Sequence, residues 1–247
     1  MGFTYTAYRA LLDLLRQGGY AFTDYHAYQA HPRCVILRHD IDNSLPQALR
    51  LAEIEAEEGV KSTWFVLLRT DFYNPASAAA QKMLRRIREL GHEIGLHFDE
   101  MAYACEGGAE TCAGVSTEER IVHEANILAD ICGCPITTVS MHRPSKETLE
   151  ADLQIPGMVN SYGQTFFHDF KYLSDSRRRW REPVEEIIRG GEHDRLHILT
   201  HAFWYHEQEQ DIAASVGAFI RSANAERYAQ MLENITDLPS IIARESI

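Results

Sequence analysis

The segment VILRHDID at residues 35–42 joins an apolar run to two carboxylates, Asp40 and Asp42, spaced two residues apart. Later aliphatic runs end in the same way, with polar or charged residues directly after them: His97 and Asp99, His142 and Arg143, Ser174 and Asp175, and His201. Strand ends become polar wherever they reach water, but His or Asp after several separate runs favours one shared site.

Two or three histidines with one aspartate are the ligand set of a catalytic zinc or similar divalent ion that keeps one position open for water. Such an ion lowers the pKa of water and polarises a carbonyl group, so it suits hydrolysis of an amide or ester. A second carboxylate can take the proton of the water, and a histidine can protonate the leaving group. Asp40 and Asp42 supply the carboxylates, and His201 is the candidate acid.

Strand-like runs alternate with helix-like runs along the chain, and this alternation predicts the fold. The predicted strands are residues 34–40, 62–68, 93–98, 137–142, 158–162, 170–176 and 195–201. The predicted helices are an amphipathic N-terminal helix ending at Gly18 and segments at 44–58, 77–90, from 119, from 146, from 183, and 208–238. The pattern indicates an α/β fold with parallel strands, as a barrel or an open sheet, in a single domain over residues 1–247.

In parallel α/β folds the loops after the strands converge over one face, and active sites collect there. The polar residues after the aliphatic runs are therefore expected to meet. His39 alternates with Asp40 along its strand and is expected to face the opposite side. His92 precedes its strand beside Gly91 and is expected in a turn, not at the site.

The chain has 247 residues and a formal net charge of −12. This charge disfavours nucleic acid or an anionic membrane as a partner, because an extended phosphate surface would be repelled. No apolar run reaches about 18 residues, so no segment is expected to span a bilayer. The N-terminal segment lacks a basic region and a cleavage site, and is predicted to be structural and not a signal peptide.

The five cysteines, Cys34, Cys105, Cys112, Cys132 and Cys134, cannot all pair, which favours a reduced, cytoplasmic chain. Neither the C-G-C pair nor the pair Cys105 and Cys112 has the C-x-x-C spacing of a zinc ribbon. Thiols without a metal role are therefore expected.

The segments LRHDID, GHEIGLHFDE, SMHRPS, YLSDSRRRW and HILTH occur in an order and spacing that resembles the polysaccharide deacetylase superfamily, also called the NodB homology domain or carbohydrate esterase family 4. The likeness spans residues 5–205 and is nearer to the bacterial branch found with surface-polysaccharide genes. It implies a distorted (β/α) barrel with about seven parallel strands, a divalent metal that is usually zinc, and removal of N- or O-acetyl groups from sugars.

The resemblance also implies roles for particular residues. Asp40 matches the base and Asp42 a metal ligand, although the two roles are exchangeable in a split pair. His97 matches the first of two ligand histidines, but the second position holds Met101, which is not a ligand of the usual hard kind. His142 is predicted to replace this ligand, with a supporting role beside the metal as its alternative.

Asp99 or Glu100 is the other candidate for the third ligand. The HRPS motif implies that Arg143 orients the base. The LTH motif implies that His201 is the general acid and that Leu199 lines the acetyl pocket.

The motif YLSDSRRRW implies that Asp175 or Arg177 holds the acid or the substrate. Trp180 offers either a stacking face for a sugar or a buried structural ring. The basic run at residues 177–181 is either a clamp for a carboxylated or nucleotide-linked sugar or a solvated loop. In the second interpretation it pairs with the acidic residues that follow it, Glu182, Glu185 and Glu186.

The leading hypothesis is a cytoplasmic, metal-dependent carbohydrate deacetylase acting on a sugar or sugar intermediate in surface-polysaccharide assembly, of the O-antigen or capsule type. The alternatives are an amidohydrolase acting on a small non-sugar C–N bond and a catalytically silent sugar-binding protein on the same fold. The expected partner is an acetylated or nucleotide-linked sugar and not nucleic acid, and the sequence leaves a homo-oligomer open.

Overall fold

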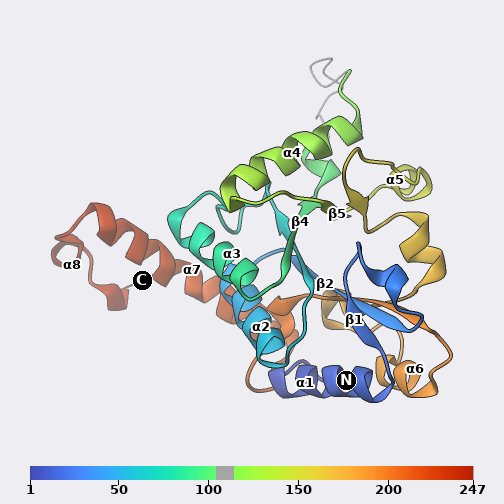
Figure 1. The fold of residues 1–247 in the computed structure, drawn as a ribbon. Helices are drawn as coiled ribbons and strands as arrows, with labels where there is room; N and C mark the ends of the chain where they lie inside the picture. Colours follow the sequence, from blue (N-terminus) through green and yellow to red (C-terminus); the bar gives the residue numbers. More distant parts are fainter. Residues whose placement is uncertain (104–113, 247) are drawn as a thin grey trace. The chain divides into compact units, whose positions relative to one another are not determined.

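The computed structural model of the chain describes residues 1–103 and 114–246. It divides into two compact units, Met1–Glu207 and Gln208–Ile247, which are described separately. The first unit is an α/β fold whose strands are parallel to one another (Figure 1). The expectation of a single domain over residues 1–247 stays a prediction.

The described strands form one sheet and are β1 (Ala21–Thr23), β2 (Cys34–Ile41), β3 (Thr63–Leu67), β4 (Glu93–Phe98), β5 (Thr138–Met141), β6 (Val159–Asn160), β7 (Lys171–Ser174) and β8 (Arg195–Thr200). Their order is β6-β5-β4-β3-β2-β8-β7, with β1 against the first residues of β2. Because β8 lies beside β2, strands β2 to β8 follow one circular order that is open between β6 and β7. The predicted fold class, a distorted parallel barrel, is confirmed.

Aromatic rings connect the two strands at this opening. The ring centroid of Phe167 lies 5.2 Å from that of Tyr162, just after β6, and 5.6 Å from that of Tyr172 on β7. Phe167 belongs to a short π-helix, Thr165–Asp169, in the connection between the two strands. Ring contacts therefore join the sheet edges that do not pair as strands.

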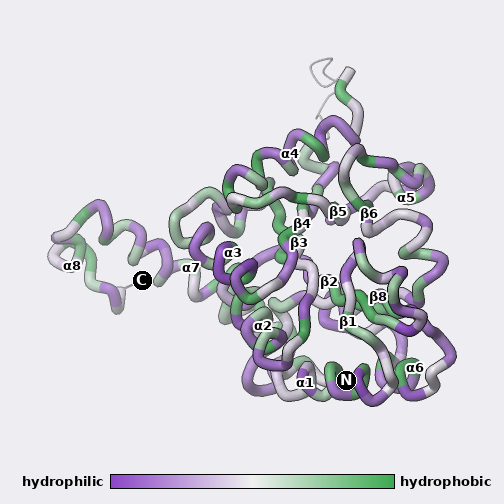
Figure 2. Tube along the Cα trace, viewed as in Figure 1, coloured by the Kyte–Doolittle hydropathy of each residue, from purple (hydrophilic) through white to green (hydrophobic). Residues whose placement is uncertain are grey.

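The helices of the first unit are α1 (Tyr5–Gln17), α2 (Leu45–Glu57), α3 (Ala78–Glu89), α4 (Thr117–Cys132), α5 (Lys146–Glu150) and α6 (Val184–Gly190). Hydroxyl side chains cap most of them by accepting a backbone N–H: Thr4, Ser44, Ser77, Ser116 and Ser145. Hydrophilic and hydrophobic residues alternate along α4, as expected of a helix with one buried face (Figure 2).

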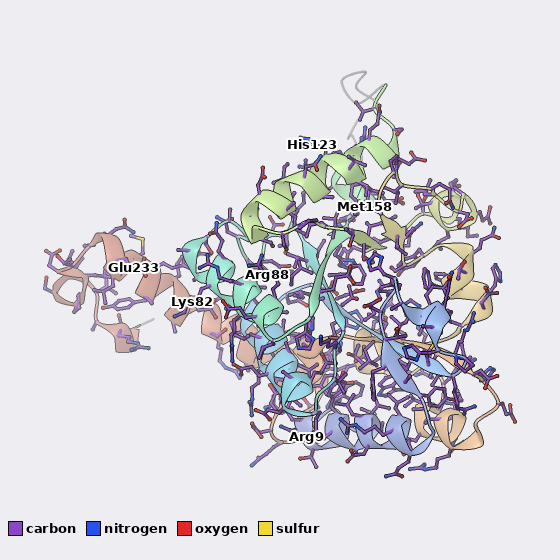
Figure 3. All side chains as sticks on the ribbon, viewed as in Figure 1. Arg9, Lys82, Arg88, His123, Met158 and Glu233 are labelled. Atoms are coloured by element: carbon purple, nitrogen blue, oxygen red, sulfur yellow. The ribbon has the colours of Figure 1, made fainter. Side chains whose placement is uncertain are left out.

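Neighbouring helices pack side by side outside the strands. Helix α1 contacts α2 and α6, α2 contacts α3, and α3 contacts α4 (Figure 1). Arg88 of α3 donates to the carbonyls of Cys132 and Gly133 at 3.0 and 2.8 Å, at the end of α4 (Figure 3). This outer layer covers one side of the strands.

Strand β2 is buried along its whole length, and its side chains alternate between two surroundings. Cys34 and Ile36 belong to a small apolar cluster inside the curled sheet. The two-residue period of a strand places Arg38 and Asp40 on that same inner face and His39 on the outer face. A strand that begins in the core therefore turns a charged pair toward the interior of the barrel.

His39 faces the helices, as predicted. Its Nε2 lies 2.9 Å from Oε1 of Glu55 on α2, and its Nδ1 lies 2.6 Å from Oγ1 of Thr200 on β8. The hydroxyl of Tyr8 on α1 donates to the same Glu55 oxygen at 2.6 Å. His92 also lies outside the site but is buried, with Nδ1 3.7 Å from Oε2 of Glu55. These groups form a polar network beneath α1 and α2.

The predicted strands are all present, each within a few residues of its expected ends, whereas β1 was not predicted. Its three residues are too few to show a period. Cys34 and Cys132 are buried free thiols and Cys134 is a half-buried one. Cys105 and Cys112 lie outside the described residues. Within residues 1–103 and 114–246, no helix has both the length and the apolar character needed to cross a bilayer.

The second unit is helical, as expected for residues 208–238. Its main elements are α7 (Ile212–Asn234) and α8 (Leu238–Ile241). Asp211 caps α7 by accepting from the N–H of Ala214 at 2.7 Å. The hydroxyl of Tyr228 on α7 donates to the carbonyl of Ile242 at 3.1 Å, which links α7 to the end of α8.

Candidate metal centre and active site

Asp42, His97 and His142 come together at the carboxyl ends of β2, β4 and β5. Nε2 of His97 and Nδ1 of His142 each lie 3.3 Å from Oδ1 of Asp42, and the two nitrogens are 3.1 Å apart. Tetrahedral ligands held about 2.0–2.1 Å from zinc are roughly 3.3–3.4 Å from one another. The three atoms therefore have the spacing of three corners of a tetrahedral zinc site.

The environment of Asp42 also fits a cation. Its Oδ1 is buried and, among the described residues, no group donates to it with hydrogen-bond geometry. The nitrogens of His97 and His142 are nevertheless at ion-pair distance from it. Burial raises the pKa of Asp42, but the two imidazoles outweigh this and hold the pKa well below its usual range. A buried, ionised oxygen facing two ring nitrogens is what a divalent ion requires.

Ser140 on β5 orients the ring of His97. Nδ1 of His97 lies 2.9 Å from Oγ of Ser140, and the guanidinium of Arg38 donates to the same oxygen. Because that oxygen can accept two N–H groups, Nδ1 of His97 can carry its proton there. Nε2 of His97 is then left with a lone pair directed at Asp42, as a metal ligand requires.

Arg38 holds Asp40, the predicted base, with two hydrogen bonds. Nε donates to Oδ1 of Asp40 at 2.8 Å and Nη2 donates to Oδ2 at 2.7 Å, and both side chains are buried. Burial raises the pKa of Asp40, but the guanidinium of Arg38 outweighs this, so the pKa is lowered. Oδ2 of Asp40 lies 3.5 Å from Nε2 of His97. Asp40 is thus an oriented, ionised carboxylate beside the metal cluster.

His201, the predicted acid, also lies near Asp42, with Nε2 3.8 Å from Oδ2. Asp175 holds the ring, since Nδ1 of His201 lies 2.7 Å from Oδ1 of Asp175. The hydroxyl of Tyr205 donates to the other Asp175 oxygen at 3.2 Å. Burial lowers the pKa of His201, but Asp175 and then Asp42 outweigh it and raise the pKa to about 9. A raised pKa suits an imidazole that acts as a proton donor.

Arg143 does not orient Asp40. Its Nε donates to Oδ1 of Asp99 at 3.2 Å, and a second donor of the same guanidinium reaches the other Asp99 oxygen. The role expected for Arg143 falls to Arg38, which reaches Asp40 because the two residues share the inner face of β2.

Asp99 and Glu100, the alternative third ligands, are engaged elsewhere. Asp99 holds Arg143, and Glu100 accepts from the N–H of Ser145 and the hydroxyl of Thr148. Both contacts join the end of β4 to the segment after β5. Met101, at the missing ligand position, is exposed.

The predicted substrate-binding residues lie in different surroundings. Leu199 is buried on β8 and shares a face with His201 two residues later. Asp175 is fully buried, and its carboxylate holds the imidazole of His201. Trp180 is partly buried and packs against the hydrophobic core, which favours its structural interpretation. Arg177 is exposed just after β7.

Sequence reasoning did not assign Arg38 or Ser140 to the site. Arg38 could be inferred from the sequence, because it precedes Asp40 by two residues and must share its face of the strand. Ser140 had the same signal, since it stands two residues before His142. Its contact with His97 depends on the pairing of β4 with β5, which places Ser140 opposite His97.

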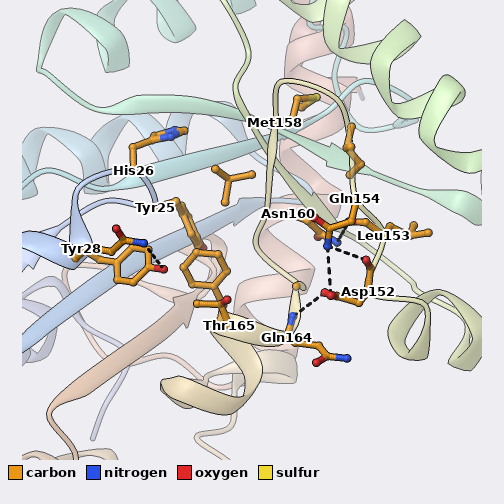
Figure 4. A pocket seen from close by; sticks show the side chains of 15 residues that line it. Tyr25, His26, Tyr28, Asp152, Leu153, Gln154, Met158, Asn160, Gln164 and Thr165 are labelled. Atoms are coloured by element: carbon orange, nitrogen blue, oxygen red, sulfur yellow. Dashed lines mark hydrogen bonds between the residues drawn. The ribbon is translucent and has the colours of Figure 1, made fainter.

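A cavity of about 470 Å³ lies apart from these residues. Its walls come from the segment after β1 and from residues 152–166, and no residue of the metal cluster lines it (Figure 4). Asp152 accepts from the N–H of Gln164 at 2.9 Å there. Because Asp152 is its one lining carboxylate, the cavity lacks the ligand set of the site at the strand ends.

No protein-family model matches the chain, and no curated protein matches it by sequence. Solved structures are similar to it at low identity. A family 4 carbohydrate esterase from Bacillus anthracis is 16% identical over 92% of this chain and 93% of that one, with a TM-score of 0.41. A family 4 acetyl xylan esterase from Clostridium thermocellum, in complex with a cobalt ion, is 15% identical over 78% and 84% of the two chains, with a TM-score of 0.38.

A CE4 family pseudoenzyme from Bacillus anthracis is also similar, at 13% identity over 79% of this chain and a TM-score of 0.44. The match covers 63% of the pseudoenzyme chain. These structures carry the name of the family that the sequence motifs resemble. At these identities and TM-scores, the likeness by itself carries no argument about this chain.

Proposed function

We propose that this protein is a metal-dependent hydrolase that removes an acetyl group from a sugar. The observation that carries the proposal is the triad of Asp42, His97 and His142, with Asp40 3.5 Å from His97 and His201 3.8 Å from Asp42. Carboxylate, metal-ligand set and imidazole acid are the three groups that hydrolysis of an acetamide or acetyl ester needs.

Asp42, His97 and His142 would hold the ion, with zinc as the best match to two nitrogens and one oxygen at this spacing. The bound ion supplies a lower pKa for water and polarisation of the acetyl carbonyl. Asp40, fixed by Arg38, takes a proton from the attacking water. His201, fixed by Asp175, donates a proton to the sugar nitrogen or oxygen as its bond to the acetyl carbon breaks. Acetate and the deacetylated sugar are the products.

The finer features of the proposal rest on the motif resemblance. They are a sugar or nucleotide-linked sugar as substrate, a role in surface-polysaccharide assembly, and action in the cytoplasm. The free thiols of Cys34, Cys132 and Cys134 support a reducing compartment. A homo-oligomer stays a prediction.

Metal content and acetate release test the proposal together. Elemental analysis of the purified full chain should find near-stoichiometric zinc, lost in His97→Ala and in His142→Ala. His123→Ala on the exposed face of α4 is the matched control and should keep the metal (Figure 3). Acetate release from acetylated sugars should follow the metal content of these variants.

Two results would contradict the proposal. A wild-type chain that stays empty after zinc is offered would favour the catalytically silent sugar-binding alternative. A zinc-loaded chain that cleaves small cyclic amides but releases no acetate from any acetylated sugar would favour the amidohydrolase alternative.

A further inference from the structure

We propose that the substrate of this site carries an anionic group, a carboxylate or a phosphate, and that Arg177 and Arg179 bind it. This inference rests on the proposed deacetylase function and adds the class of its substrate. The two arginines belong to the segment after β7, at residues 176–181, which we call the arginine loop.

The arginine loop begins directly after a residue of the catalytic machinery. Asp175, which holds His201, is the residue before it. The backbone ties the loop to this point, because the N–H of Arg179 donates to the carbonyl of Asp175 at 3.1 Å and the N–H of Arg181 donates to that of Ser174 at 3.3 Å. The loop therefore lies at the carboxyl end of β7, on the face of the barrel that carries the site.

The acidic residues that follow the loop do not neutralise it. Glu182 accepts from Nζ of Lys171 at 2.6 Å, and Glu185 lies 3.6 Å from a guanidinium nitrogen of Arg189. Among the described residues of the first unit, no carboxylate pairs with the exposed guanidinium groups of the loop at Arg177, Arg179 and Arg181. Unpaired arginines this close to a site stand out in a chain with a net charge of −12.

The backbone of the loop is held in a costly shape. Arg177 and Arg178 have φ angles of +59° and +57°. These lie in the left-handed region, which residues other than glycine seldom adopt. Such a backbone conformation is strained and persists where the surroundings impose it, often at binding sites. Two in succession, starting two residues after Asp175, point to a loop shaped for binding.

Guanidinium chemistry identifies the ligand class. Arginine presents parallel N–H donors that match the oxygens of a carboxylate or phosphate, and its charge does not depend on pH in the working range. A neutral acetylated sugar offers no group of this kind. Phosphate would come from a nucleotide-linked or phosphorylated sugar, and carboxylate from an acidic sugar.

Binding measurements on the full zinc-loaded chain test the inference. The probes are UDP-N-acetylglucosamine for phosphate, N-acetylmuramic acid for carboxylate, and N-acetylglucosamine as the neutral reference. At least one anionic probe should bind about tenfold tighter than the reference, and added salt should weaken that advantage. The double variant Arg177→Gln/Arg179→Gln should lose this advantage over N-acetylglucosamine.

The matched control is Lys82→Gln/Arg85→Gln, which removes the same charge from the exposed face of α3 (Figure 3). It should keep the preference for the anionic probe. Equal affinities for all three probes, or an equal loss in the control and in the loop variant, would overturn the inference. Acetate release from neutral sugars alone would overturn it while leaving the proposed function intact. If the loop binds the anionic probes in a chain that holds no metal and releases no acetate, the proposed function is overturned and the anion-binding role of the loop stands.

Discussion

Arg38 contacts both halves of the site. Its guanidinium holds both oxygens of Asp40 and also reaches Ser140, which in turn orients His97. It is fully buried, so Asp40 and Arg38 are each other's main counter-charge. A planar fork is needed for this arrangement, because an ammonium group cannot serve two carboxylate oxygens and a hydroxyl in fixed directions.

We therefore expect Arg38→Lys to lower kcat for acetate release by about 10- to 100-fold, because a misplaced base loses its attack geometry. Zinc content should fall less than the rate, since the ligands Asp42 and His142 are not bonded to Arg38. Steady-state kinetics and elemental analysis on the same preparations measure both effects. Arg143→Lys is the control, and a loss of rate there equal to that in Arg38→Lys would return the orienting role to Arg143.

His197 is a buried neutral histidine inside the curled sheet. Its Nε2 lies 2.7 Å from the hydroxyl of Tyr25, and burial followed by the charge of Arg38 lowers its pKa to about 3 from the ordinary value of 6.5. In the pH window between these values the unfolded chain binds a proton that the folded chain excludes. Stability therefore falls as the pH falls through this window.

Below pH 6.5, His197 lowers the free energy of unfolding by up to about 1.4 kcal/mol for each unit by which the pH falls. His197→Leu should make the free energy of unfolding less dependent on pH between 6.5 and 4, whatever its effect on stability at neutral pH. Urea unfolding at a series of pH values measures the slope. His168→Leu at an exposed position is the control, and an unchanged slope in His197→Leu would show that the histidine is protonated in the fold.

Strand β4 carries His97 and must lie very close to its neighbours. Gly95 shares the inner face with His97, two residues away. A Cβ at Gly95 would lie 2.6 Å from Cε1 of Phe65 on β3 and 3.1 Å from the carbonyl oxygen of Thr138 on β5. Phe65 is fully buried and cannot move aside freely. Glycine at this position therefore permits the strand spacing that brings His97 to Asp42.

Gly95→Ala is expected to destabilise the fold by about 1–3 kcal/mol through overpacking, and to weaken zinc binding because β4 must shift. Thermal unfolding and zinc titration check the two effects. Gly190→Ala in α6 is the control, because a Cβ there meets nothing within 4 Å. If the Gly95→Ala variant is destabilised but keeps full zinc affinity, the packing of β4 does not control the metal site.

The candidate site lies within the first of the two compact units. The metal cluster, the base, the acid and the arginine loop all precede Glu207, the last residue of the first unit. The residues from Gln208 onward contribute no ligand or catalytic group to the described site.

A chain that ends at Glu207 is therefore expected to fold and to bind zinc as the full chain does. Circular dichroism and elemental analysis of the shortened and full chains make the comparison. Loss of the metal in a shortened chain that keeps its helical and strand signals would show that the second unit supports the site.

The local sequence determined which residues form strands and which side chains stand at their carboxyl ends. A buried strand such as β2 can be recognised in the sequence from its run of apolar residues and its two-residue period. These signals predicted Asp40, Asp42, His97 and His201 as candidate site residues, because each follows or ends such a run.

The tertiary structure alone decided the partners. That Ser140 meets His97, and that Asp175 holds His201, depends on which strands are neighbours and on side-chain directions. The pairing of β4 with β5 and of β7 with β8 sets these neighbours, and pairing between distant segments leaves no local pattern in the sequence. The same holds for the opening between β6 and β7, since the closure of a sheet depends on the sum of its strand pairings.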